Sequence, residues 1–100
     1  MDIKETINGT AVELIVIGRL DTLTAPQLEA RVRESAKKAK ALFMDLSQVE
    51  YISSAGLRVV LLAHKLMIGV FGNFIVKNPS PFCCQVFEAT GMDGALNIEK

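Results

Sequence analysis

The chain has 100 residues, of which 50% are hydrophobic, and its 11 basic residues balance 11 acidic ones. That length suits one core and leaves no material for a second lobe, so residues 1–100 are expected to form a single domain. The balanced charge, with no basic cluster outside residues 37–40, argues against direct binding of nucleic acid. The N-terminus lacks a signal pattern and no apolar run approaches the roughly 18 residues of a membrane-spanning helix, so we expect no transmembrane segment and a cytoplasmic location.

The chain opens with a predicted hairpin. Residues 3–7 and 11–20 have strand-like sequences on either side of Asn8-Gly9, a dipeptide that favours a tight turn. The second of these strands is apolar on both sides, which indicates a position inside a sheet.

A helix is predicted next, from Thr24 to Lys40. Thr24 and Gln27 have the spacing of a capping box, and Pro26 lies in the first turn, where its missing N–H does least harm. Apolar residues then recur at helical spacing, so this helix is expected to cover the sheet.

Strands and helices alternate through the rest of the chain. The predicted elements are a strand at 41–46, a helix at 55–67, a strand at 73–77, a helix capped by Ser80 that runs through Ala89, and a terminal strand at 95–98. The order ββαβαβαβ predicts an α/β domain with a mixed, mainly parallel sheet covered by helices.

The stretch from Asp45 to Arg58 carries the strongest functional signal. Here a strand-like sequence passes through a serine-glycine turn into an apolar helix, which places Ser54 at a helix N-terminus. The unpaired N–H groups and the positive end of the helix dipole at such a position would stabilise an added phosphate. Ser54 is therefore a candidate phosphorylation site.

Together with residues 18–21 and 78–80, this stretch resembles the STAS domain, specifically the stand-alone anti-anti-sigma factors, also termed anti-sigma factor antagonists. The most specific part is the segment 52–58. The resemblance implies a regulator, not an enzyme, that binds an anti-sigma factor serine kinase to release a sigma factor and is inactivated when the kinase phosphorylates one serine. By its position in the motif that serine matches Ser54. The best-known members carry an aspartate just before the phosphorylated serine, where this chain departs from the pattern with Ser53, so Ser53 stays open as the less favoured alternative. No cofactor is implied, and a serine phosphatase would be a second partner.

The helix after Ser54 has two largely apolar faces. The face expected to pack on the sheet comprises Leu57, Val60, Leu61, His64 and Met67. The opposite face comprises Arg58, Val59, Leu62, Lys65 and Leu66. This second face is too apolar for full exposure, so either a neighbouring helix covers it or it binds a protein partner.

The predicted partner surface surrounds the serine turn. From the turn and its helix it includes Ser53, Ala55, Gly56, Arg58, Val59 and Leu62, and the resemblance adds Asp21, Thr22 and Thr24. Asp21 and Asp45 are both expected to lie close to the serine turn, where each either sensitises the hydroxyl or serves as a turn carboxylate.

Two other functions are weighed against this one. An enzyme with Ser53 or Ser54 as its nucleophile is disfavoured, because the chain lacks a Gly-x-Ser-x-Gly elbow and its sole histidine, His64, lies nearly three turns beyond Ser54. His64 has no second ligand at a suitable spacing, so no metal site is predicted. A regulatory STAS subunit of a membrane transporter is the alternative that the resemblance also allows.

The second half of the chain also contains a cysteine pair and an apolar segment. Cys83 and Cys84 are adjacent and cannot form an ordinary disulfide, so two free thiols are expected. The apolar segment 67–72 either folds over the core, self-associates or contacts a membrane surface, and its residues Ile68 to Phe71 are expected to be partly exposed.

Overall fold

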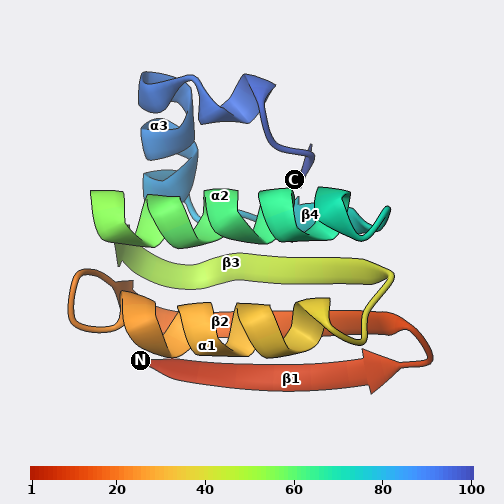
Figure 1. Cartoon of the computed structure of the whole chain (residues 1–100). Helices are drawn as coiled ribbons and strands as arrows, with labels where there is room; N and C mark the ends of the chain where they lie inside the picture. Colours follow the sequence, from red (N-terminus) through yellow and green to blue (C-terminus); the bar gives the residue numbers. More distant parts are fainter.

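The computed structural model describes residues 1–100 as a five-stranded sheet with three α-helices and a short 3₁₀ turn (Figure 1). The elements are β1 (Asp2–Asn8), β2 (Ala11–Leu20), α1 (Ala25–Ala36), β3 (Ala41–Ile52), α2 (Ser54–Gly69), β4 (Asn73–Lys77), α3 (Pro81–Thr90), η1 (Met92–Gly94) and β5 (Ile98–Glu99). The strands follow chain order across the sheet, with β1 antiparallel to β2 and every other pair parallel. The predicted α/β class with a mixed, mainly parallel sheet is confirmed.

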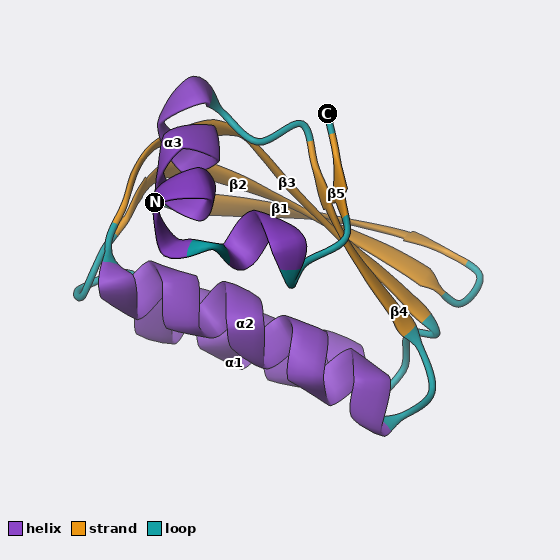
Figure 2. Ribbon diagram, turned by 90° about the horizontal axis from the view of Figure 1, so that it is seen from above, coloured by secondary structure: helices purple, strands orange, loops and turns teal.

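Helices α1 and α2 lie side by side over one face of the sheet (Figure 2). The strand residues that point toward them are buried, including Val12, Leu14 and Val16 on β2 and Leu42, Met44 and Leu46 on β3. The residues between them, such as Ile15 and Ile17, are only half-buried, because no helix covers the other face. The core therefore lies on one side of the sheet, mainly beneath the helix pair, and Cys83 and Phe87 of α3 extend it.

Helix α3 stands across the direction of β3, and its N-terminal end meets β3 where β3 extends beyond β4 (Figure 1). β4 pairs only with the first part of β3, from Ala41 to Asp45. After Asp45, the backbone of β3 is bonded by Ser80 instead of β4. The N–H of Ser80 donates to the carbonyl of Leu46 over 3.1 Å, and its hydroxyl donates to the carbonyl of Val49 over 2.6 Å. Ser80 also caps α3, whose C-terminus is closed by Gly91 at φ 74°, as the sequence predicts.

The length of β3 differs from the prediction. The strand was expected to end at residue 46, but it continues to Ile52 because it stays paired with β2 through two register shifts. Polar residues such as Ser47, Gln48 and Glu50 occupy exposed positions in this continuation, so the local pattern there does not look like a strand.

Two helix predictions also need correction. Thr24 precedes α1 but makes no side-chain cap bond, because its hydroxyl is used inside the preceding loop, and α1 ends at Ala36 instead of Lys40. On α2 the buried stripe is Gly56, Val59, Val60, Ala63 and Met67. Leu57, Leu61 and His64 are only half-buried, because α2 packs against both the sheet and α1 and its buried stripe turns toward α1.

The C-terminal third of the chain holds both cysteines and the last strand. Cys83 and Cys84 are free, as expected, and burial raises the pKa of the Cys83 thiol. The last strand is shorter and later than predicted, at Ile98–Glu99. None of the α-helices combines the length and the apolarity that crossing a membrane requires.

Candidate functional site

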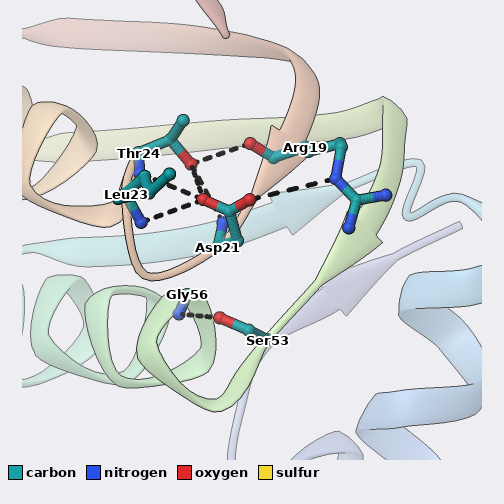
Figure 3. A network of polar contacts seen from close by, with 6 residues as sticks. All are labelled: Arg19, Asp21, Leu23, Thr24, Ser53 and Gly56. Carbon is teal, nitrogen blue, oxygen red and sulfur yellow. Dashed lines mark hydrogen bonds and ion pairs between the residues drawn. The ribbon is translucent and has the colours of Figure 1, made fainter.

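The turn between β3 and α2 is fixed by its backbone and by Ser53. Ile52 pairs with Leu20 at the end of β2, and the next N–H, that of Ser53, donates to the Leu20 carbonyl over 2.9 Å. Ser53 has an extended backbone at the N-cap of α2, and its hydroxyl accepts the N–H of Gly56 over 3.4 Å (Figure 3). Ser53 therefore ties the start of the helix to the sheet.

Ser54 has different surroundings. It is the first residue of α2, it is exposed, and its hydroxyl makes no hydrogen bond within the protein. The backbone beneath it belongs to a regular helix, so an accessible hydroxyl is held on an ordered support. Attachment of a phosphate there would place the negative charge beside the unpaired N–H groups of the first helical turn.

Gly56 allows the helix to start this close to the sheet. A Cβ atom at this position would lie 2.7 Å from the Leu20 Cγ, 2.8 Å from the Leu20 carbonyl oxygen and 2.9 Å from the Ile52 Cγ1. Any larger side chain would push the first turn of α2 away from the ends of β2 and β3. Gly56 is buried, so its role at the site is to set the position of Ser54.

The loop from Asp21 to Thr24 lies beside this turn and is held by its own polar groups (Figure 3). The Asp21 carboxylate accepts the N–H groups of Leu23 over 3.0 Å and Thr24 over 3.2 Å. The Thr24 hydroxyl accepts the N–H of Asp21 over 2.9 Å and donates to the Arg19 carbonyl over 2.8 Å. The loop is therefore a fixed feature and not a flexible arm.

The charge of Asp21 is stabilised in this loop. Desolvation acts to raise the pKa of its carboxyl, but the N–H bonds from Thr24 and Leu23, the Thr24 hydroxyl and the nearby Arg19 guanidinium together lower that pKa below its ordinary value. The Arg19 Nε lies 3.9 Å from the Asp21 carboxylate, and the same guanidinium stacks over the Tyr51 ring. A carboxylate that is ionised near neutral pH thus lies beside the serine turn.

Leu23 is a feature that the sequence reasoning missed. It is 89% exposed at the tip of the loop, while the polar residues around it hold the loop in shape. The available signal was a large apolar residue inside a polar turn, Asp21 to Thr24, at the end of a buried strand. Its side chain therefore contributes almost no burial to the fold.

A shallow open depression of about 320 Å³ runs between the N-terminal halves of α1 and α2. It is lined by Thr22, Ala25, Pro26, Glu29, Ala55, Arg58, Val59 and Leu62. Several predicted partner residues are thus brought together here. Arg58 is exposed and Leu62 is half-buried. Val59 is only 4% exposed at the floor of the depression, so at this residue the neighbouring helix covers the second face, and Val59 is not an exposed partner contact.

The position predicted for Asp45 is wrong, whereas the alternative that it serves as a turn carboxylate is confirmed. Asp45 lies in the middle of β3, opposite Ile15 on one side and Lys77 on the other, whereas the serine turn follows Ile52 at the far end of the strand. Its carboxylate accepts the N–H of Ser47 over 2.9 Å and the hydroxyl of the same residue over 2.7 Å. Asp45 therefore shapes the irregular part of β3, because the strand runs on past its predicted end.

Comparison with known proteins places this architecture in one family. The family model of the STAS domain matches residues 3–100. The proposed anti-sigma factor antagonist BtrV of Bordetella bronchiseptica is 39% identical over 75 residues, which cover 74% of this chain and 65% of BtrV. The match thus spans a little less than two thirds of that relative.

Solved structures agree over the full sheet and helix pair. An anti-sigma factor antagonist from Mycobacterium paratuberculosis superposes with a TM-score of 0.88 and 26% identity, covering 98% of this chain and 84% of the other. The phosphorylated form of the Bacillus cell fate determinant SpoIIAA superposes with a TM-score of 0.79 and 20% identity, covering 99% of this chain and 92% of the other. Because the STAS domain model matches nearly the whole chain, the chain belongs to the STAS domain family, and several of the relatives that it matches are named anti-sigma factor antagonists.

Proposed function

We propose that this protein is an anti-sigma factor antagonist that binds an anti-sigma factor kinase in the cytoplasm, releases the sigma factor held by that kinase, and is inactivated by phosphorylation of Ser54. The observation that carries the proposal is the contrast at the serine turn: Ser54 is exposed with an unbonded hydroxyl, whereas the neighbouring Ser53 hydroxyl caps the helix. The protein acts as a binding module and as the substrate of its partner, and it needs no catalytic group of its own.

The docking surface of this proposal surrounds Ser54. The exposed Leu23 on the Asp21 loop supplies an apolar anchor, and the depression between α1 and α2 supplies a complementary hollow with Leu62 at its wall. Arg58 at the edge of the hollow supplies a cation that orients the kinase. A kinase that covers this surface has the Ser54 hydroxyl within its reach.

Phosphorylation would oppose this complex through charge. A phosphate adds about −1.5 to −2 charges and strong acceptor oxygens, and desolvating them in an interface is costly without new cations from the kinase. The ionised Asp21 carboxylate adds like-charge repulsion on the same surface. Arg58 lies one helical turn after Ser54, so the phosphate can also draw this guanidinium away from the partner.

The test is phosphate transfer with a matched pair of variants. The cognate kinase is captured from the source cells on the wild-type protein and identified by mass spectrometry, and it is then incubated with ATP and each variant. Ser54→Ala removes the exposed hydroxyl, and Ser53→Asn removes the other hydroxyl but keeps an N-cap acceptor. We expect transfer to the wild type and Ser53→Asn, no transfer to Ser54→Ala, and release of the kinase only after transfer.

Two other outcomes would contradict the proposal, and a third would extend it. Transfer to Ser54→Ala but not to Ser53→Asn would move the acceptor to Ser53. Capture of a transport protein and no kinase would favour the transporter-subunit alternative. A serine phosphatase that restores kinase binding to the modified protein would complete the proposed cycle.

A further inference from the structure

The end of the molecule opposite the serine turn carries exposed apolar side chains. Ile68 is 58% exposed, Val70 is 52% exposed and Phe71 is 100% exposed, all at the C-terminal end of α2, so the predicted exposure of this segment is confirmed. We refer to these three residues as the apolar tip. Their side chains contribute little burial to the fold.

The position of Phe71 makes its exposure more informative. The N–H of Phe71 donates to the Ile68 carbonyl over 3.0 Å, and the N–H of Gly72 donates to the Met67 carbonyl over 2.7 Å, which is the bond pattern of a Schellman motif. The left-handed position of this motif, at φ 58°, ordinarily holds glycine or asparagine, yet here it holds Phe71. The fold thus accepts backbone strain and a fully hydrated ring at the same residue, which points to a use for the ring outside the fold.

Cations surround the apolar tip. Helices α1 and α2 run in the same direction, so their C-terminal ends meet at this end of the molecule (Figure 1). An open depression of about 330 Å³ between them is lined by Arg33, Ala36, Lys37, Leu66 and Val70. Lys40 lies next to the tip, since its carbonyl accepts the N–H of Asn73 over 2.9 Å, and Lys65 is one helical turn before the tip. Lys37, Lys40 and Lys65 are exposed and form no ion pair in the protein.

From this arrangement we propose that the apolar tip and Lys37, Lys40 and Lys65 dock the protein on the surface of an anionic phospholipid bilayer. Exposed apolar side chains at the end of a helix can enter the headgroup region, while the lysines contact lipid phosphates. A two-fold contact between two copies through this end would instead bring the same lysines against one another, which electrostatic repulsion disfavours. Charge therefore selects the anionic bilayer over a second copy.

The orientation leaves the serine turn free. The tip follows the C-terminus of α2 and Ser54 is at its N-terminus, and a helix of 16 residues is about 24 Å long. A docked molecule therefore keeps the serine turn away from the lipid. Membrane docking is independent of the proposed phosphorylation switch.

The test is co-sedimentation of the full chain with vesicles. One set of vesicles contains phosphatidylcholine alone, and the other contains equal parts of phosphatidylcholine and phosphatidylglycerol. We expect weak binding to the anionic vesicles that decreases as salt rises, and no binding to the neutral ones. Substitution of each of Lys37 and Lys65 by Gln should weaken binding about fivefold, and Phe71→Gly about tenfold.

Phe71→Gly also separates docking from folding. Glycine suits the left-handed position, so its Tm should rise while its vesicle binding falls. Leu23→Ser is the matched control, because it removes an equally exposed apolar side chain from the other end of the molecule and should leave vesicle binding unchanged. The proposal is overturned if the protein does not bind anionic vesicles, or if Leu23→Ser and Phe71→Gly lose vesicle binding equally. A lower Tm for Phe71→Gly would also overturn it, because the side chain would then stabilise the fold. Concentration-dependent self-association that Phe71→Gly abolishes, in a protein that binds no vesicles, would identify a second copy as the partner instead.

Discussion

Ser53 and Ser54 are neighbours in the chain but contribute to the molecule in different ways. Ser53 is half-buried and its hydroxyl accepts a helix N–H, whereas Ser54 makes no such bond. Sequence alone ranks these residues only by resemblance, because both are serines beside the same helix start. The capping bond, which depends on where the helix begins, supplies the physical distinction.

Gly56 should tolerate substitution less than any other residue of the turn. Gly56→Ala places a Cβ within 3 Å of Leu20 and Ile52, so it is expected to lower the free energy of unfolding by about 1–3 kcal/mol. Gly69→Ala is the matched control at the other end of α2, where a Cβ meets no atom within 4 Å, and it should leave stability unchanged or raise it. Urea unfolding of both variants measures the difference, and equal stabilities would contradict the close packing at Gly56.

Asp21 should make stability depend on pH at the acidic end. Its folded-state pKa lies below the ordinary value of 3.8, so its carboxylate stabilises the fold above that value and this contribution is lost as pH falls through the folded-state pKa. Asp21→Asn keeps an acceptor for the loop N–H groups but removes the charge. The stability difference between wild type and variant should therefore be constant near neutral pH and shrink below about pH 4 in urea unfolding. A difference that grows on acidification would contradict the assignment.

Among the elements, those with strong local signals were predicted well. The turn after Asn8, strand β4 and the two ends of α3 at Ser80 and Gly91 each depend on residues adjacent in the chain. The second half of β3 was missed because it is specified by pairing with β2, which lies far away in sequence. The position of Asp45 was missed for the same reason.

The buried side of α2 illustrates a different limit. A helical wheel reports which residues share a side but not how many neighbours the helix has. Val59 was placed on a face that either a neighbouring helix covers or a partner binds, and the structure shows that α1 packs next to α2 and covers this residue. Of the predicted partner surface, the structure gathers Thr22, Ala55, Arg58 and Leu62 around one hollow, while the exposed Leu23 required the loop geometry to be recognised.

Ser80 joins α3 to β3, so its loss should loosen that helix. Ser80→Ala removes the hydroxyl that donates to the Val49 carbonyl and accepts the N–H of Cys83, and it is expected to cost about 1–3 kcal/mol. Ser47→Ala, which removes an exposed hydroxyl bonded to Asp45, should change stability by less than about 0.5 kcal/mol. Hydrogen exchange should show faster opening of α3 in Ser80→Ala only. Unchanged exchange would mean that the buried contacts of Cys83 and Phe87 hold the helix without the bond.

At the scale of the molecule, the parallel course of α1 and α2 separates two surfaces. Their N-terminal halves frame the proposed kinase surface, and their C-terminal halves frame the basic apolar end. Changes at one surface are therefore expected to leave the other unaffected, since substitutions at distant sites act nearly independently.

Leu23→Ala tests whether the exposed side chain of Leu23 anchors the kinase. Truncation of an exposed anchor should weaken kinase affinity by about 1–2 kcal/mol while Tm stays unchanged, because the side chain is 89% exposed in the free protein. Ile7→Ala is the control, since this side chain is 53% exposed on the N-terminal hairpin and outside the proposed surface. Calorimetric titration with the identified kinase measures both, and equal affinities for the two variants would exclude Leu23 as an anchor.

The place of β1 at the margin of the sheet has a consequence for aggregation. β1 pairs only with β2, so its outer backbone groups are open to any extended chain, and charged residues such as Asp2, Lys4 and Glu5 discourage such additions. β2 lacks this protection: its sequence from Ala11 to Leu20 is mostly aliphatic. Proteolytic removal of β1 would therefore expose the unpaired backbone groups of this aliphatic strand. The shortened protein should then assemble into insoluble polymers even if its helices and remaining strands stay folded.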